Sequence, residues 1–416
     1  MLFTLRSDYM FVSILRLAAR NLRRNSNRTL VATLTVASGI VAFLLAGGFI
    51  HWIFHDMREA TIHSQLGHMQ IVRPGFFEKG IADPYAFLLP AHSDEQKVVE
   101  QMAGVVSVTP RLAFSGLASF GETTISFVGE GIDPVRERPI SSRITIQSGK
   151  DLNDSEQQSV LLGEGLARSL GVKPGDMIVL LATAANGSPN AIEISVAGTF
   201  ATISKEYDDV ALRLPITLTR KLMRVQGATS WVVLLDQTEK TGAVVNALHS
   251  KLPADGFELV PWSMLADFYN KTVVLFSKQV SVVKFIIGLI IVLTISNTQT
   301  MSVLERTREI GTSLAIGQRR RAVMHMFLVE GVLIGVLGGG AGALLGYLLG
   351  ELISLIGIPM PPPPGMARGY IGQILISPAL AGEAIVLALL TTLLASLMPA
   401  WKASRMNIVD ALRHNQ

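Results

Sequence analysis

Four ionisable side chains recur at intervals of four residues: His51, His55, Glu59 and His63. In a helix this spacing places them on one face, and imidazole and carboxylate groups arranged in this way are able to ligate zinc. The stripe follows directly after a long apolar run, so a polar stripe at a membrane interface is the simpler interpretation. We expect no bound metal here, and the sequence leaves the role of the stripe open.

A second charge, Glu330, lies near the start of another long apolar segment. Carboxylates inside membrane segments are candidates for function by default. The position of Glu330 close to the end of the segment favours an ion pair with a neighbouring basic residue.

The motifs of nucleotide hydrolysis and covalent catalysis are missing from the sequence. It has no G-x-x-x-x-G-K-[ST] loop to hold nucleotide phosphates, no nucleophile elbow and no zincin motif. It also has no cysteine, which excludes disulfides and thiolate metal sites. The basic clusters flank apolar runs, which argues against nucleic acid as a partner. We therefore expect no enzyme activity, no catalytic residue and no cofactor in this chain.

Four segments have the length and apolar character of membrane spans. Charged residues make up only 16% of the 416 residues, against about 25% in a typical soluble domain. A span needs roughly 20 mostly apolar residues, and the segments that qualify are 30–54, 285–301, 322–353 and 378–400. The first is longer than the apolar region of a signal peptide, so we expect an uncleaved anchor.

Basic residues are concentrated beside alternate ends of these spans. Segments 1–29, 301–325 and 401–416 together hold 14 basic and four acidic residues, whereas the rest of the chain holds 22 and 28. Basic residues near membrane ends mark the cytoplasmic side. We therefore expect a multi-pass protein of the bacterial inner membrane with both termini in the cytoplasm: an amphipathic segment over 1–29 and a tail over 401–416.

The long segment 55–284 is predicted to be a mixed α/β domain on the periplasmic side. Flanking residues 55–65 and 263–284 have no strong helix breaker and are expected to extend the spans as stalk helices. Helix–strand pieces on both sides of a strand-rich middle indicate two subdomains, one of them discontinuous. Strands are expected at 66–73, 105–114, 123–129, 177–181, 191–200, 231–235 and 257–260, and helices at 93–102, 160–170 and 238–251.

Two segments beside the spans carry a longer signature. Ser302–Arg321 contains Glu-Arg-Thr-Arg-Glu-Ile-Gly followed by Ala-Ile-Gly, and Met398–Arg413 contains Pro-Ala near its start and Ala-Leu-Arg at its end. Both resemble the signatures of the FtsX/MacB/LolC-LolE family of ABC transporter permeases; Ile408 departs from the pattern, which usually has proline. The resemblance implies an α-helical membrane protein with four transmembrane helices. It also implies a MacB-like periplasmic core inserted between the first and second spans.

The resemblance also implies partners and a mechanism. Two permease copies, identical or homologous, would pair with a dimer of a cytoplasmic ABC ATPase, which alone binds ATP and Mg. Dimerisation of the ATPase would push a cytoplasmic coupling helix, and the stalk would transmit this motion without a channel through the bilayer. Membrane lipid and a periplasmic carrier or outer-membrane protein are further expected partners.

The loop 302–321 is the candidate for ATPase coupling. The apolar edge formed by Ile310, Leu314 and Ala315 is expected to dock into a groove of the ATPase. The basic residues would meet acidic rims of that groove; the alternative is a basic loop needed only for topology. The predicted coupling residues are Glu305, Arg306, Arg308, Glu309, Ile310, Leu314, Ala315 and Gly317.

Four glycines of the third span, Gly338, Gly342, Gly346 and Gly350, are spaced four apart. Such a small-residue face allows close helix packing, either within one subunit or across a dimer interface. The following periplasmic loop over 354–377 contains a proline run that cannot be helical, and it is expected to be a stiff spacer.

Three functions remain open at this point. The first is a permease that extracts or exports an amphiphile such as a lipoprotein, lipid or peptide. The second is an FtsX-like signalling subunit that activates a periplasmic partner without moving cargo. The third, a scaffold without an ATPase, is disfavoured by the coupling signature. The size of the outward domain favours the first.

Overall fold

The structure, a computed structural model, describes residues 15–80, 83–91, 93–153, 158–361 and 369–408. It divides into two compact units, which we call the helical unit and the α/β unit. The helical unit comprises Met1–Ile53, Val273–Pro359 and Ile371–Gln416, and the α/β unit comprises Phe54–Thr272 and Met360–Tyr370. The ends of the predicted segments 1–29 and 401–416, and residues 362–368 of the proline loop, lie outside the described residues.

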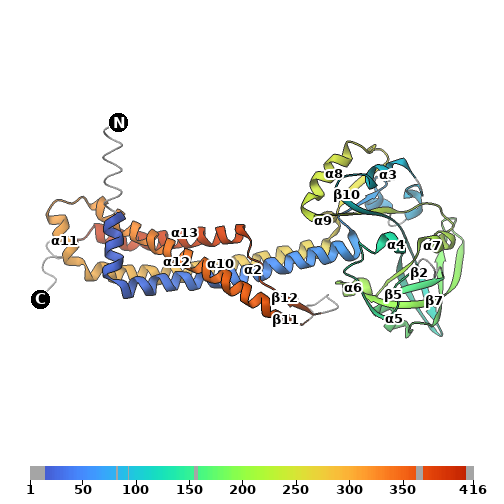
Figure 1. Ribbon diagram of the computed structural model, residues 1–416, viewed down its shortest axis with the longest axis horizontal. Coiled ribbons are helices and arrows are strands. Elements are labelled where there is room, and N and C mark those ends of the chain that lie inside the picture. The colour runs from blue at the N-terminus through green and yellow to red at the C-terminus, as the bar shows by residue number, and fades with distance from the viewer. Residues whose placement is uncertain (1–14, 81–82, 92, 154–157, 362–368, 409–416) are drawn as a thin grey trace. The chain divides into compact units, whose positions relative to one another are not determined.

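Four long helices are the main elements of the described part of the helical unit. They are α2 (Ser26–Thr61), α10 (Asp267–Glu305), α12 (Arg320–Ile356) and α13 (Pro378–Ser404), and each is long and apolar enough to cross a membrane. The 36 residues of α2 span about 54 Å, well over the roughly 30 Å of a hydrocarbon core. A further helix over 15–24 precedes α2, and the short helix α11 (Thr307–Ala315) connects α10 to α12 (Figure 1).

Helix α12 approaches α2 closely through its glycines. A Cβ atom at Gly342 would lie 2.7 Å from the carbonyl oxygen of Ala37, and one at Gly338 would lie 2.6 Å from Cβ of Val36. Gly346 meets Leu44 in the same way. Without a side chain at these positions, the two backbones come close enough for extensive dispersion contacts, which replace the hydrophobic driving force inside lipid.

The α/β unit is built on one ten-stranded sheet, and the strands of this sheet are spread over most of the sequence of the unit. The strand order is β10-β1-β9-β2-β3-β8-β5-β7-β4, and β6 pairs with β2 and β7. The strands are β1 (Met69–Val72), β2 (Val105–Phe120), β3 (Thr123–Ile132), β4 (Thr145–Gly149), β5 (Ser159–Gly163), β6 (Met177–Thr183), β7 (Pro189–Ala201), β8 (Ala211–Pro215), β9 (Ser230–Leu235) and β10 (Glu258–Pro261).

Short helices connect these strands. They are η1 (Ile62–Leu66), η2 (Phe76–Gly80), η3 (Pro84–Phe87), α3 (Asp94–Glu100), α4 (Pro134–Glu137), α5 (Glu164–Leu170), α6 (Lys205–Asp208), α7 (Ile216–Met223), η4 (Thr238–Lys240), α8 (Thr241–His249) and α9 (Trp262–Leu265). Two short strands near the end of α12, β11 (Ile358–Met360) and β12 (Tyr370–Gly372), form a separate sheet.

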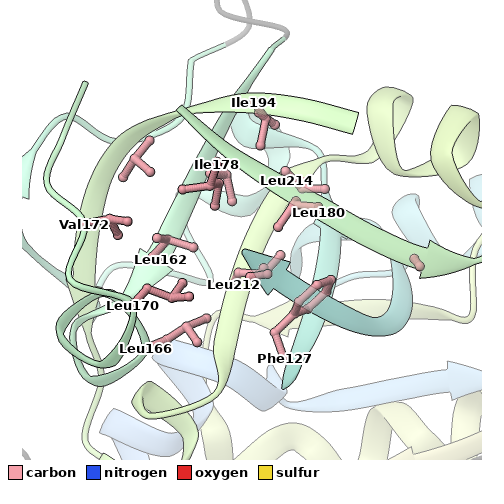
Figure 2. Close-up of a cluster of buried hydrophobic side chains, with 14 of the residues drawn as sticks. Phe127, Leu162, Leu166, Leu170, Val172, Ile178, Leu180, Ile194, Leu212 and Leu214 are labelled. Carbon is pink, nitrogen blue, oxygen red and sulfur yellow. The ribbon is translucent and has the colours of Figure 1, made fainter. Parts of the chain in front are cut away.

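Two large hydrophobic cores, with smaller buried clusters beside them, stabilise the α/β unit. The first includes Phe127, Leu162 and Leu212 and lies among β2, β3 and the strands β5 to β8 (Figure 2). The second surrounds Trp231 and joins β1, β9 and β10 to helices α3 and α8. The second core thus combines segments from both ends of the unit's sequence, as expected for a discontinuous subdomain.

Strand β2 contributes to both cores. Its first half pairs with β9, for example Val108 with Val233. Its second half pairs with β3 on one side, Phe114 opposite Gly129, and with β6 on the other. The two cores therefore belong to one continuous sheet.

The predicted helix over Val160–Leu170 is wrong in its first part. Residues Ser159–Gly163 form β5, and helix α5 begins only at Glu164. All five residues of β5 are buried, with β7 on one side of the strand and β8 on the other. A short apolar run inside a sheet has no alternation, so it matches strand and helix patterns equally. Gly171 does end α5, in the left-handed conformation with φ of 75°.

Candidate functional site at helix α11

The segment predicted for ATPase coupling forms two helical pieces separated by a break. Helix α10 ends at Glu305, and Arg306 has a backbone conformation outside the helical range (φ −99°, ψ 11°) before α11 begins. After α11, Gly317 adopts a φ of 99° that favours glycine, because a Cβ atom would be strained there. Helix α11 is therefore a separate nine-residue element with a turn at each end.

Arg306 fixes the start of α11 from inside the helical unit. Its side chain is buried, and its Nη1 donates a hydrogen bond to Oε1 of Glu330 at 3.0 Å. Asn21 donates to the same oxygen at 2.8 Å, and the guanidinium lies over the ring of Phe327 at 5.6 Å. The prediction that Glu330 pairs with a basic residue is confirmed. Removing either partner would leave a buried charge without its counterion, a change that typically costs about 3–5 kcal/mol.

Two further ion pairs hold the break between α10 and α11 from outside. Nη2 of Arg24 donates to the carboxylate of Glu309 at 2.7 Å, and both guanidinium amines of Arg28 contact Glu305. The Arg24 guanidinium holds the pKa of Glu309 below its usual range. Exposed pairs such as these add less than about 1 kcal/mol each to stability. Their contribution is geometric. The Arg24 pair connects the first turn of α11 to the helix over 15–24, and the Arg28 pair connects the last turn of α10 to α2.

Ile310 and Leu314, two of the three residues of the predicted docking edge, face inward, which corrects the prediction for these two residues. Ile310 and Leu314 are 3% and 8% exposed and pack in one cluster with Phe327, Ala400 and Ala403. They are therefore not available to dock into a groove of another protein. The spacing of four residues that places them on one edge serves instead to hold α11 on α12 and α13.

The exposed side of α11 and of the following turn is mostly polar and carries one large apolar residue. Ile316 is 83% exposed, the highest value of any isoleucine in the described residues. The predicted coupling residues Arg308, Ala315 and Gly317 are exposed as well. The predicted coupling residues did not include Ile316. Two features of the sequence could have marked it: it lies inside the Ala-Ile-Gly signature, and no apolar residue at helical spacing offers it a packing partner.

A small polar cavity lies behind Arg306. Its volume is about 30 Å³, and it is lined by Asn21, Gln299 and Glu330 among others. Gln299 is buried, and neither polar atom of its amide has a hydrogen-bond partner among the described residues. A space of this size with several polar groups is sufficient for about one water molecule, which would satisfy the Gln299 amide.

A second polar junction, in the α/β unit, receives the end of α2. After α2 and η1, the carbonyl oxygen of Ser64 accepts a hydrogen bond from Arg213 at 3.0 Å, and that of Gln65 accepts one from Arg111. Both arginines are buried in strands, 1% and 4% exposed. Carbonyl groups at a helix end lack intrahelical partners, so these guanidinium groups cap the end of the helix.

Two glutamates balance these arginines. Glu137, 2% exposed, contacts Arg111 through Oε1 and lies 4.0 Å from Arg213, while Glu130 lies 3.2 Å from Arg213 and 3.6 Å from Arg111. Burial alone would raise the pKa of Glu130, but the two arginines outweigh burial and hold that pKa below its usual range. Burial, reinforced by Glu130, raises the pKa of the Tyr207 hydroxyl. The junction is therefore a charged cluster that is largely buried, with Glu130 as its partly exposed member.

The histidine stripe leads into a third contact of the same helix end. Glu59 lies 3.6 Å from His63 and accepts a hydrogen bond from Thr238 at 3.0 Å. His68 accepts at Nδ1 from the backbone N–H of Leu235, so the neutral ring carries its proton at Nε2, which faces Thr238 at 3.0 Å. Burial lowers the pKa of His68 to about 4. Within the described ranges, no group of three or more His, Asp or Glu side chains could hold a metal ion.

Comparison with known proteins matches two parts of the chain to two different family models. A family model described as the FtsX-like permease C-terminal matches residues 281–408, and one described as the MacB-like periplasmic core domain matches residues 29–251, more than half of the chain. An uncharacterized ABC transporter permease of Methanocaldococcus jannaschii is 22% identical, with 96% of this chain and 97% of the relative covered.

Longer relatives are also similar. The macrolide export ATP-binding/permease protein MacB of Rhodospirillum rubrum is 27% identical over 97% of this chain, which spans only 60% of the length of that relative. Among solved structures, the periplasmic region of MacB from Actinobacillus actinomycetemcomitans is 15% identical, with a TM-score of 0.34, and the match covers 49% of this chain and 93% of that structure.

Proposed function

Since the chain belongs to the ABC transporter permeases that combine an FtsX-like C-terminal part with a MacB-like core domain, we propose that it transmits force from a cytoplasmic ATPase to its α/β unit. The ATPase is a separate dimeric subunit that binds ATP and Mg, and two permease copies, identical or homologous, assemble with it. The movement extracts or exports an amphiphile such as a lipoprotein or lipid, handed on to a periplasmic carrier or outer-membrane partner.

The observation that carries this proposal is the construction of α11. One side of the helix is fixed to the helical unit by a buried ion pair and an apolar cluster, while the other side presents Arg308 and Ile316 to a partner. A push on such an element moves the helices that hold it, because the interior is close-packed and does not yield locally. Enzyme chemistry in this chain is not needed for that role.

The long helices α2 and α10 give a path for the movement. The boundary between the two units falls inside both helices, and neither is interrupted there. The buried arginines at the end of η1 then join the helix backbone to strands β2 and β8. In this proposal α11 lies in the cytoplasm and the α/β unit in the periplasm of a bacterial inner membrane, as the distribution of basic residues favours.

The coupling role is tested by a charge reversal and its compensation. Glu305→Lys breaks the contact with Arg28, the one ion-pair partner of Glu305 among the described residues, and should leave membrane insertion and ATPase binding intact while abolishing the ATP-driven movement of a spin label on Lys173→Cys in the α/β unit. The double variant Arg28→Glu with Glu305→Lys restores opposite charges and should restore the movement. Normal movement in the single variant, or none in the double variant, would contradict the proposal. Glu164→Lys, which breaks only an exposed pair within α5, is the matched control.

The absence of cysteine makes a topology test straightforward. A membrane-impermeant maleimide applied to intact spheroplasts should label Lys173→Cys, whereas Arg320→Cys should react only after lysis. The reverse pattern would refute the placement of α11 beside a cytoplasmic ATPase. Mass spectrometry of the purified complex then separates transport from FtsX-like signalling: a co-purifying lipoprotein or lipopeptide supports transport, and a stably retained periplasmic enzyme supports signalling.

A further inference from the structure

An open groove lies beside the helix over 15–24, away from the ion pairs of α11. Its volume is about 550 Å³, within the usual range of small-molecule sites. It is lined by that helix, the first turns of α2 and the middle of α12, including Leu22, Arg23, Leu30, Leu333 and Leu337. Most of its surface is apolar, and Arg23 is the only charged residue in the lining.

The charge around the groove is unbalanced. Of the arginines between positions 16 and 28, Arg24 and Arg28 are neutralised by Glu309 and Glu305. Arg16, Arg20 and Arg23 are exposed and make no ion pair with any residue that the structure describes. Positions 16, 20 and 23 share one face of a helix, so three positive charges without counterions run along the helix that forms the rim of the groove.

We propose that this groove binds one anionic phospholipid, with an acyl chain along α2 and α12 and the headgroup phosphate at Arg23. The groove matches both the acyl chain and the headgroup of such a lipid. The acyl chain replaces water on the apolar walls, and the phosphate neutralises Arg23 and its neighbour Arg20 on the cationic rim. Basic clusters next to the end of a membrane helix are recognised in this way by anionic lipid headgroups.

Such a lipid would act on the coupling network directly. The helix over 15–24 also supplies Asn21, which contacts Glu330, and Arg24, which contacts Glu309. Asn21 and Arg24 therefore belong to the same short helix as Arg23. Occupation of the groove fixes the position of this helix and, through it, the position of α11.

The proposal is tested by native mass spectrometry of the full chain with phosphatidylglycerol and phosphatidylcholine. Each Lys or Arg near an anionic lipid contributes about 1 kcal/mol, a factor of about five in affinity. The wild type should therefore bind phosphatidylglycerol at least fivefold more tightly than phosphatidylcholine, and Arg23→Gln should lose about fivefold. Arg16→Gln removes the same charge from the same face two turns away, about 10 Å along the helix axis, and should change the affinity less than twofold.

A second pair of variants tests the apolar part without changing charge. Leu337→Trp fills the groove and should abolish tight binding of phosphatidylglycerol, whereas Leu344→Trp, on an exposed position of the same helix outside the lining, should not. Equal binding of the two lipids, or equal losses within either matched pair, overturns the proposal. It is also overturned if Arg23→Gln dissociates a dimer without releasing lipid, which would assign the groove to a second copy. Phosphatidylglycerol binding that appears only after removal of residues 1–14 would assign it to that segment.

Discussion

Replacing Glu137 by glutamine removes one negative charge from the buried junction at the end of α2 while keeping the shape of the side chain. Glu137 accepts hydrogen bonds from both Nε and Nη2 of Arg111 and from Ser141. After the substitution, Glu130 is the only close carboxylate that Arg111 and Arg213 have in the described part of the chain. Breaking a buried pair on one side costs about 3–5 kcal/mol, and the amide retains part of the hydrogen bonding, so we take about 3 kcal/mol.

This loss is measurable as a thermal shift. For a unit of about 200 residues, 1 kcal/mol lowers Tm by about 2–4 °C, which predicts a decrease of about 6–12 °C for the α/β unit. Hydrogen exchange should report where the loss occurs. Because both arginines donate to carbonyls of η1, the amides around residues 62–68 should exchange faster than the rest of the unit.

The matched control is Glu164→Gln. Glu164 makes a single pair with Arg168, exposed on both sides, and its loss should cost less than about 0.5 kcal/mol. The reasoning would be refuted if Glu137→Gln lowered Tm no more than this control. It would also be refuted if exchange increased everywhere except at residues 62–68, because the junction would then not hold the helix end.

Two further predictions concern other contacts. Because burial keeps His68 neutral in the folded state, with a pKa of about 4 against about 6.5 when unfolded, the contribution of His68 to the stability of the α/β unit should fall by at most about 3 kcal/mol as pH decreases from 6.5 to 4. Burial raises the pKa of Asp208 to about 6, which acts in the opposite direction over the same range, so the test is a difference between variants. The difference in Tm between wild type and His68→Gln should shrink as pH falls, whereas the difference between wild type and the exposed His249→Gln should not. Gly342→Val should push α12 from α2 and lower the Tm of the helical unit by an amount equivalent to about 1–3 kcal/mol, whereas Gly340→Val, with no atom within 4 Å of its Cβ, should not; equal melting of the two variants would contradict close packing at Gly342.

The sequence was most informative where one local rule acts alone. Long apolar runs required helices, and the observed α2, α10, α12 and α13 contain the four predicted spans. Gly171 marked the end of α5 because few other residues adopt its left-handed conformation. Glu330 could be expected to have a partner because a lone carboxylate in an apolar segment is costly.

Prediction failed where distant segments decide the structure. Strand β8 has only five residues, with Arg213 at its centre, and it is a strand because β3 and β5 lie on either side of it. The direction in which Ile310 and Leu314 point depends on α12 and α13, which helical spacing does not reveal. A charged residue in the middle of an apolar strand, as at Arg111 and Arg213, was the one available signal of the buried junction.

Strand β2 has a consequence for how the α/β unit responds to load. Its backbone bonds to β9 in one half and to β3 and β6 in the other, so no loop separates the two cores. A pull applied where η1 meets Arg111, near the middle of β2, is shared by backbone hydrogen bonds on both sides of that point. We therefore expect the α/β unit to move as one rigid body when α2 moves, because it has no hinge between its two cores.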